Sequence, residues 1–232
     1  MEPEGPKLME QEKQKVLLFD FPNHGAVLGK LSDEDMKYLW KAIKKGKKDN
    51  LKMNHTLAGN ITTSLAIKDK DNRIFTYVRT IIQGYEKKFG KPYHSWLTQH
   101  GGSELKYDLS LDSFWVNFQR QNEFNPMHNH SGAYSFVIWM KIPTEWEDQK
   151  ELPIAKNSGD SRAISSFILS YTDILGGIKT LTFQMNKERE GQLLLFPSQI
   201  YHLVNPFYNC DEERVSISGN IYLDIKEKVK NK

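Results

Sequence analysis

The hydrophobic and polar positions of this chain change their period about halfway along it. Ser32, with Asp35 three residues later, predicts the start of a helix, and Gly46 predicts its end. A second helix is predicted over residues 72–89, with Gly90 closing it. Apolar residues of the first helix recur at i, i+3, i+4 and i+7, the spacing of one helical face: Met36, Leu39, Trp40 and Ile43.

After about residue 105 the pattern becomes that of short strands separated by Gly, Pro, Asn or Asp. Strands are predicted at residues 111–120, 133–142, 163–171, 178–185, 192–196, 201–205 and 215–223, after an early one at 16–21. So many short strands favour a β-sandwich or barrel over βαβ units. Residues 54–65 have no clear pattern and residues 144–162 form a polar insertion. We expect these two segments to line the entrance of a site.

Composition narrows the class of protein. The chain has 232 residues, 38% of them hydrophobic, and a formal net charge of +3. This suffices for one sizeable core, but no apolar run approaches the roughly 20 residues of a membrane-spanning helix. The near-neutral charge argues against a dedicated nucleic-acid binder. Residues 1–15 are polar, are expected to be flexible, and do not resemble a secretory signal, so we expect a cytoplasmic protein.

Histidine is the residue on which any metal site must depend. The single cysteine, Cys210, excludes a disulfide framework and a Cys-rich zinc site. His128 and His130 would point to one face of a strand, because side chains at i and i+2 do so. His202 follows a buried strand that ends at Pro197, and a barrel could bring it to the same point. Two surface histidines in a loop and a third in the core are the alternative.

A polar face is predicted on the last strand. Arg214, Ser216, Ser218 and Asn220 alternate with apolar residues, so they share one side of it. An inward-facing arginine needs an anionic partner, and a guanidinium can hold a carboxylate through two parallel hydrogen bonds. The alternative is a structural ion pair, for instance with Glu123 or Asp108.

Together these motifs resemble those of the Fe(II)/2-oxoglutarate-dependent dioxygenases, in particular the prolyl-hydroxylase-like and phage-type branch. The motifs are Asn117, His128-x-His130, Phe-Pro-Ser-x-x-x-His202 and Arg214-x-Ser216. The resemblance covers about residues 110–224. It implies a mainly β (α+β) protein: a double-stranded β-helix, a jelly-roll like that of cupins, with N-terminal helices packed on one sheet.

The resemblance also implies a division of the chain and of the site. One domain would comprise a helical support at residues 16–104, the β-helix core at 105–224 and a tail at 225–232. Fe(II) would be held by His128, His130 and His202, which would be the catalytic residues. The cosubstrate 2-oxoglutarate would be held by Arg214 and Ser216, with Asn117 and Asn220 as further candidate contacts. Dioxygen would take the remaining metal position, and a substrate C–H bond would be hydroxylated.

One departure from the family pattern keeps other readings open. The usual triad is His-x-(Asp/Glu)…His, and here His130 stands at the carboxylate position. Three histidines also suit a cupin-like metalloenzyme that does not use 2-oxoglutarate, or zinc. A more distant carboxylate such as Asp108, Asp112 or Glu123 could complete the site. A non-catalytic binding module on the same fold is a further alternative. The substrate (small molecule, protein or peptide) and the oligomeric state, a homodimer included, stay open.

Overall fold

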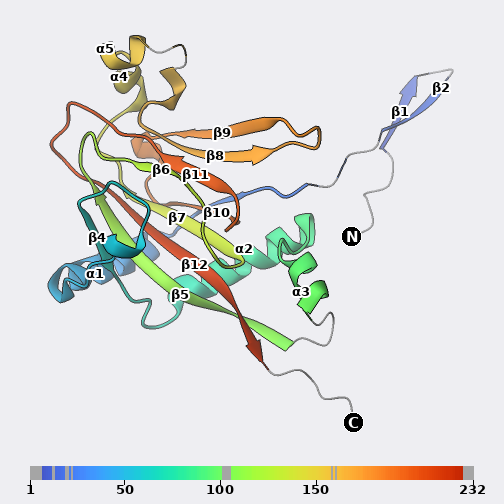
Figure 1. The fold of residues 1–232 in the computed structure, drawn as a ribbon, viewed down its shortest axis with the longest axis horizontal. Coiled ribbons are helices and arrows are strands. Elements are labelled where there is room, and N and C mark those ends of the chain that lie inside the picture. The colour runs from blue at the N-terminus through green and yellow to red at the C-terminus, as the bar shows by residue number, and fades with distance from the viewer. Residues whose placement is uncertain are drawn as a thin grey trace.

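Two facing antiparallel β-sheets form the centre of the molecule, and two long helices cover the outer side of the larger sheet (Figure 1). The computed structural model describes residues 7–11, 14–18, 21, 23–100, 106–157, 159 and 161–226. No helix in this part of the chain is long and apolar enough to cross a membrane.

The larger sheet has six strands and the smaller has four. In spatial order the larger contains β3 (Val27–Lys30), β10 (Gln192–Pro197), β7 (Tyr134–Lys141), β12 (Arg214–Lys226), β5 (Lys106–Gln119) and β4 (Thr63–Ala66). The smaller contains β6 (Asn125–His128), β11 (Tyr201–Val204), β8 (Ser166–Thr172) and β9 (Ile178–Gln184). From β5 to β12 the chain crosses repeatedly between the two sheets. This confirms the predicted jelly-roll core with N-terminal helices on one sheet.

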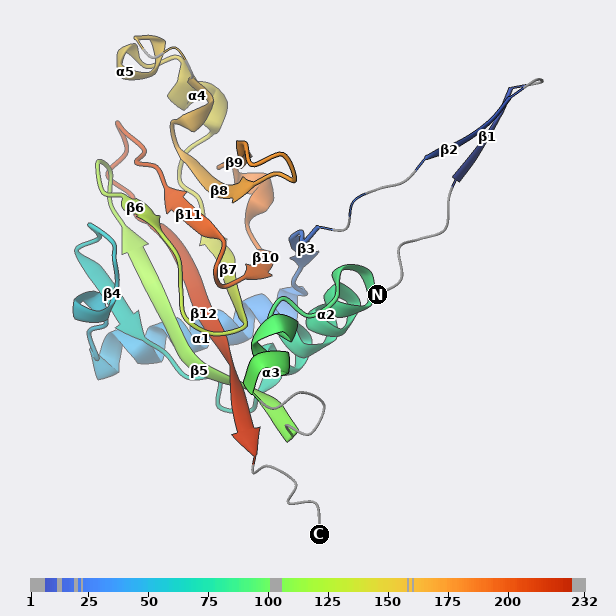
Figure 2. The ribbon, with the colours of Figure 1, turned by 45° about the vertical axis from the view of Figure 1, so that its right-hand side comes forward.

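The remaining elements lie around this core. They are the hairpin β1 (Lys7–Gln11) and β2 (Gln14–Leu18), the helices α1 (Asp33–Asp49), α2 (Arg73–Phe89), α3 (His94–His100), α4 (Trp146–Lys150) and α5 (Pro153–Lys156), and the 3-10 turns η1 (Asn54–Thr56), η3 (Ser161–Ala163) and η4 (Lys187–Arg189). The short helices α4 and α5 lie at the end of the sheets away from α3 (Figure 2).

The larger sheet is buried on both faces, and its residues alternate between two cores. In β7, Phe136 and Ile138 pack in the same cluster as apolar residues of α1 and α2. Val137 and Trp139 pack instead with Phe167 and other residues of the smaller sheet. Successive side chains of a strand point to opposite faces, so one strand serves the helix-side core and the inter-sheet core at once.

Helix α1 begins where the sequence predicts but ends later. Ser32 caps it, since its hydroxyl accepts a hydrogen bond from the Asp35 backbone N–H. The helix continues past Gly46 to Asp49, and Asn50 ends it in the left-handed conformation at φ 50°. The prediction that Gly46 ends the helix is therefore wrong. A Cβ on Gly46 would lie 2.7 Å from Cγ2 of Ile67, so close packing against the chain after β4 requires glycine there.

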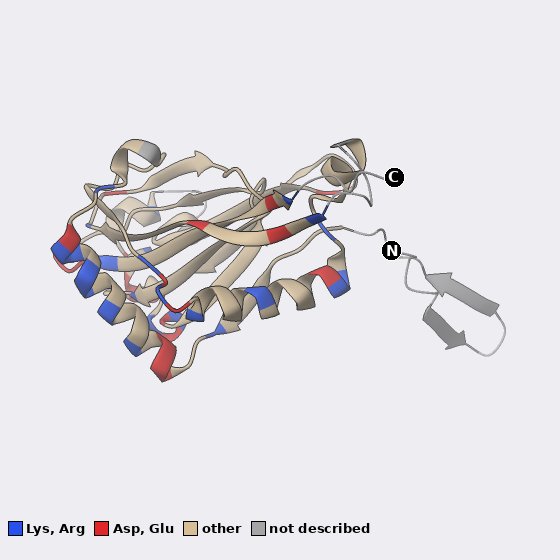
Figure 3. Cartoon of the chain, turned by 90° about the horizontal axis from the view of Figure 1, so that it is seen from below, with Lys and Arg blue, Asp and Glu red and all other residues tan. Residues whose placement is uncertain are grey.

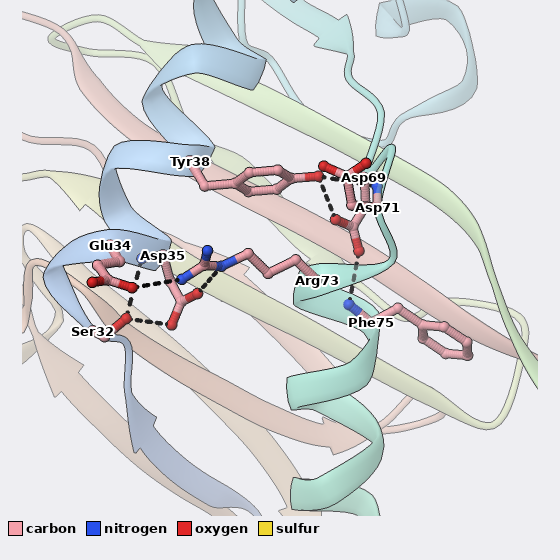
Figure 4. A network of polar contacts seen from close by, with 8 residues as sticks. All are labelled: Ser32, Glu34, Asp35, Tyr38, Asp69, Asp71, Arg73 and Phe75. Atoms are coloured by element: carbon pink, nitrogen blue, oxygen red, sulfur yellow. Dashed lines mark hydrogen bonds and ion pairs between the residues drawn. The ribbon is translucent and has the colours of Figure 1, made fainter.

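A polar network joins the first turns of α1 and α2 (Figure 4). Arg73, at the start of α2, donates to Asp35 in the first turn of α1. Asp69 accepts from the hydroxyl of Tyr38 and from the backbone N–H of Phe75, each at 2.8 Å. The network therefore ties the start of α2 to the first part of α1.

The outward side of the helical layer is charged. Lys and Arg positions, coloured blue, recur along successive turns of α1 in the view from below (Figure 3). The exposed lysines of this helix include Lys37, Lys41, Lys44, Lys45 and Lys48. Met36, Leu39 and Ile43 pack toward the core as their spacing predicts, but Trp40 is exposed, so its predicted place on the apolar face is wrong.

The predicted division at residues 16–104 and 105–224 stays a prediction. The first of these segments contains α1, α2 and α3, and also supplies β3 and β4, the edge strands of the larger sheet. The early strand predicted at 16–21 is β2, which ends at Leu18. Residues 1–6, 12–13 and 227–232 lie outside the described residues. The expected flexibility of residues 1–15 and the expected tail at 225–232 are therefore not tested. Of these two segments, the structure describes β1 and the start of β2 in the first, and the end of β12, at Lys226, in the second.

Replacement of the cap of α1 tests this account of the helical layer. Ser32→Ala should lower the free energy of unfolding by about 1 kcal/mol, because a backbone N–H loses its acceptor. Ser32→Thr keeps the hydroxyl and should retain most of that stability. Urea unfolding of the three proteins measures the difference; equal stability of Ser32→Ala and the parent would contradict the capping role.

Candidate metal centre

Three histidine side chains meet between the two sheets at the paired strands β6 and β11. His128 and His202 are directly opposite each other in the antiparallel register of these strands. His130 lies two residues beyond the end of β6, where its backbone N–H donates to the Ser198 carbonyl over 2.9 Å. One ring nitrogen from each histidine lies within 4.8 Å of the other two. The structure thus brings together the three residues that the sequence singles out.

Backbone carbonyls fix which ring nitrogen faces the centre. Nδ1 of His128 lies 2.7 Å from the Pro126 carbonyl oxygen, and Nδ1 of His202 lies 3.2 Å from that of Ile200. A carbonyl oxygen can only accept, so each Nδ1 carries the proton. Each Nε2 then has a free lone pair. A carbonyl that orients a histidine in this way is the usual outer support of a metal ligand.

Burial keeps these histidines in the form that binds metal. It lowers the pKa of His128 despite the bond to the Pro126 carbonyl. Burial and the neighbouring His128 lower the pKa of His130 to about 4. Burial, with the other two histidines, lowers that of His202 to about 3. All three are therefore neutral near pH 7, and neutral imidazole is the ligand form. The donor set fits a divalent metal held from one side.

The last strand supplies a polar wall to the cavity that contains the histidines. Arg214, Ser216, Ser218 and Asn220 all line this cavity, whereas Val215, Ile217 and Ile221 pack on the helix side. Strand β5 adds residues in register, with Gln119 opposite Arg214, Asn117 opposite Ser216 and Trp115 opposite Ser218. All four residues predicted to bind the cosubstrate therefore share one cavity with the three histidines.

Arg214 is buried without a carboxylate partner. Only 3% of the residue is exposed, and no ion pair among the described residues includes it. The proposed structural partners are engaged elsewhere: Asp108 pairs with Arg79 and Lys226. Glu123 accepts hydrogen bonds from Thr62 and from the Arg120 backbone N–H. The ion pairs considered as the alternative are therefore wrong.

Neutral groups hold the Arg214 guanidinium in place. Nη1 donates to Gln119 Oε1 and to the Asn205 carbonyl, both at 3.3 Å, and Nη2 donates to Ser165 Oγ at 2.6 Å. Nε has no acceptor in the part of the chain that the structure describes. Of the five N–H donors of an arginine, Nε–H and one on Nη2 are left for a ligand. Burial lowers the pKa of Arg214 to about 9, so the group is cationic at neutral pH.

The two asparagines present donors to the cavity. Ser64 donates to Asn117 Oδ1 at 2.7 Å, and Ser135 donates to Asn220 Oδ1 at 2.8 Å. Since Asn220 Oδ1 can only accept, the Ser135 hydroxyl points to it, and Ser198 donates in turn to Ser135 Oγ over 3.0 Å. The amide NH₂ of each asparagine is left as the free donor of its side chain.

Sequence reasoning missed part of this site. Gln119 could have been found, because it lies two residues after Asn117 on the same face of a strand. Ser165 and Asn205 carry no signal in the sequence, since their contacts to Arg214 depend on how loops meet. Of the two segments suspected of lining the entrance, no described residue of 144–162 lines the cavity. The segment 54–65 contributes Asn54, Leu57, Ala58, Gly59, Ile61 and Ser64.

The other candidates lie apart from the cluster. Asp108, Asp112 and Glu123 are not among the described residues that line the cavity, so none of these carboxylates completes the histidine site. His55 and His94 are exposed, and His24 lies beside Tyr85 on α2.

A comparison with protein families matches the part of the chain that contains this site. Residues 113–220 match the model of a family described as "Putative 2OG-Fe(II) oxygenase". The matched range contains His128, His130, His202, Arg214 and Ser216. A comparison with curated proteins finds none that matches the chain.

Solved structures with similarity to this chain share little sequence with it. A Pseudomonas putida prolyl-4-hydroxylase is 12% identical, with 88% of this chain and 94% of that one covered and a TM-score of 0.47. The non-heme alpha-ketoglutarate-dependent carbocyclase SnoK from nogalamycin biosynthesis is 9% identical, with coverage of 89% and 84% and a TM-score of 0.43. A Burkholderia pseudomallei oxidoreductase of the 2OG-Fe(II) oxygenase family is 13% identical, with coverage of 62% and 56% and a TM-score of 0.34.

Removal of one imidazole tests the ligand set. His130→Ala should abolish retention of Fe(II) or of a Co(II) substitute, because two ligands remain of three. His94→Ala removes an exposed histidine outside the cluster and should leave the metal content unchanged. Metal analysis after gel filtration measures both. An unchanged metal content in His130→Ala would take His130 out of the ligand set.

Proposed function

Because residues 113–220 match a 2OG-Fe(II) oxygenase family model and contain the histidine cluster and Arg214, we propose that the chain is an Fe(II)- and 2-oxoglutarate-dependent hydroxylase. The observation that carries the proposal is the buried Arg214, which has no carboxylate partner among the described residues and lines the same cavity as the three histidines. A buried cation is costly unless an anion reaches it. A dicarboxylate that also binds the metal supplies that anion.

The residues of the cavity divide into two roles. His128, His130 and His202 would hold Fe(II) through Nε2 of His128 and of His202 and one ring nitrogen of His130. Arg214 would hold the distal carboxylate of 2-oxoglutarate with the two N–H groups that are left to it, and a carboxylate has two oxygens to match them. Ser216 lines the same wall and can add a third hydrogen bond. Asn117 and Asn220 are further candidate donors to the cosubstrate.

When bound, Fe(II) and 2-oxoglutarate supply the oxidative chemistry, in which dioxygen is consumed, the cosubstrate is decarboxylated to succinate and a substrate C–H bond is hydroxylated. The chain itself orients these groups and excludes water. Trp115, Trp139, Phe167 and Phe196 supply aromatic walls to the cavity, and the loop from Asn54 to Ile61 closes one side of it. Such walls keep bulk water from the reacting groups and strengthen the electrostatic interactions inside.

The finer assignments are also proposals. The order of the motifs is like that of the prolyl-hydroxylase-like and phage-type branch, so a C–H bond of a small molecule, a peptide or a protein side chain is the expected target. The cytoplasmic location, and the absence of nucleic-acid and membrane partners, stay predictions from the sequence.

A three-histidine metalloenzyme that does not use 2-oxoglutarate is the second candidate. The all-nitrogen donor set favours it, since three imidazoles also suit zinc and cupin-type enzymes. Such an enzyme has no need of a carboxylate-binding arginine at Arg214. The effect of an Arg214 substitution on the binding of 2-oxoglutarate therefore distinguishes the two candidate functions.

Anaerobic titration with 2-oxoglutarate tests the proposal. The protein with Fe(II) should develop a visible charge-transfer band on addition of the cosubstrate. Arg214→Ala should raise the concentration needed for half the signal by about 30-fold or more, because loss of one partner of a buried charged pair costs about 2 kcal/mol or more. Arg120→Ala is the matched control: this neighbouring arginine is exposed and pairs with Glu213, so the band should persist. No band at any concentration in the unaltered protein would refute the oxygenase function.

Turnover without a substrate distinguishes an enzyme from a binding module. Under air, the protein with Fe(II) should form succinate slowly from 2-oxoglutarate even before its substrate is known. A protein that shows the band but forms no succinate over hours would be a binding module on this fold.

A further inference from the structure

The cavity at the metal centre contains no acidic side chain. The residues that line it, as far as the structure describes the chain, include one arginine and three histidines but no aspartate or glutamate. Its other polar residues are amides and hydroxyls. Most Fe(II)/2-oxoglutarate-dependent dioxygenases, whose motifs this chain resembles, carry a carboxylate at the position of His130. Without that carboxylate, the net charge of the site with metal and cosubstrate bound is different.

The charges in the loaded site do not cancel. This step rests on the proposed function: Fe(II) contributes two positive charges, Arg214 one, and the 2-oxoglutarate dianion two negative charges. Three neutral imidazoles add nothing. One positive charge is left over in a cavity that lies between two packed sheets. A carboxylate in place of His130 would remove it.

An uncompensated charge in such a place is unfavourable. Transfer of an isolated charge from water into a protein interior costs several kcal/mol even after relaxation. No acidic residue in the described part of the chain lines the cavity, and Glu123, a candidate from the sequence, bonds to Thr62 and to the backbone at Arg120. As far as the described residues show, the compensating anion then comes from a ligand.

Several free donors of the cavity suit an anion, although Asn125 Oδ1, which also lines it, is an acceptor without a partner among the described residues. Asn220 has its carbonyl oxygen occupied by Ser135, so it offers N–H groups to a ligand. Asn117 does the same beside Ser64. Ser218 lies between them along the wall, and a hydroxyl can donate. These donors lie beside the metal centre, because Trp115, in register with Ser218, has its ring 5.9 Å from that of His130.

We infer that the substrate of this enzyme presents a monoanionic group, of the charge and size of a carboxylate, to the metal centre beside the cosubstrate. The three-histidine ligand set and the free amide N–H groups of Asn117 and Asn220 then act together to select substrates by charge. Amines and other cations are excluded, and neutral groups bind more weakly than acids.

Three small probes of the same shape and different charge test the inference. They are acetate (anion), acetamide (neutral) and acetamidinium (cation). Each is titrated into the anaerobic protein with Fe(II) and saturating 2-oxoglutarate, and binding is read from the shift of the visible band. Acetate should bind at least tenfold more tightly than acetamide, and acetamidinium should not bind.

Two charge variants separate this selection from ordinary binding of acetate to any exposed metal. His130→Asp supplies the missing carboxylate at the ligand position, so 2-oxoglutarate should still bind while the preference for acetate over acetamide falls at least tenfold. Asn220→Asp adds a negative charge to the cavity wall without altering the three metal ligands. At a 2-oxoglutarate concentration that saturates this variant, the preference for acetate over acetamide should likewise fall at least tenfold. Asn157→Asp is the control, because Asn157 is exposed and lies outside the cavity. This variant should prefer acetate over acetamide by the same factor as the unaltered protein.

The outcomes distinguish the two proposals. If the unaltered protein does not bind 2-oxoglutarate, the proposed function fails, and this inference fails with it. If it binds 2-oxoglutarate but takes acetamide or acetamidinium as well as acetate, the inference alone is wrong. It is also wrong if the preference for acetate survives both His130→Asp and Asn220→Asp, since the excess charge would then not be its cause.

Discussion

The register of β12 is the constraint on which the rest of the structure depends. This strand lies between β5 and β7, and one of its faces packs in the core under the helices while the other lines the cavity. Val215 and Ile217 pack into the core under the helices, while Arg214 and Ser216 face the cavity. A shift of one residue would move every side chain to the other face, which would bury the arginine among apolar residues and expose the valine and isoleucine to the polar cavity. The apolar packing against α1 and α2 thus fixes the position of the polar site, although no residue of α1 or α2 lines it.

Neutral hydrogen-bonding groups, not carboxylates, orient the side chains of the site. Carbonyl oxygens orient His128 and His202, and serine hydroxyls orient Asn117 and Asn220. Gln119, Ser165 and Asn205 hold Arg214 without neutralising it. An orienting carboxylate would cancel the charge that the ligand is to meet, whereas an amide or hydroxyl fixes geometry and leaves the charge available. This separation of orientation from neutralisation gives the cavity its preference for anions.

Much of the fold could be predicted, because the spacing of apolar residues along each element matches the side of that element that the structure buries. The face of α1, the bounds of α2 and the alternation along β12 follow from periodicity, since each element has one apolar side to bury. The end of α1 could not be predicted from Gly46, because that glycine serves contact with Ile67 and not a turn. The loop from Asn54 has no periodicity and takes its shape from Asn54 itself, whose side chain donates to the Ile61 carbonyl and accepts from the Ser64 backbone N–H.

The sequence by itself determined which groups are available for chemistry: three histidines in two motifs, one arginine on a polar strand face, and no thiolate cluster. Tertiary structure decided the partners of those groups. Only the antiparallel pairing of β6 with β11 places His128 opposite His202, and only the meeting of distant loops shows that Arg214 has amides and a hydroxyl around it instead of an acid. The physical reason is that side-chain periodicity is a local property, whereas the charge that surrounds a buried group depends on chain segments that are far apart in sequence.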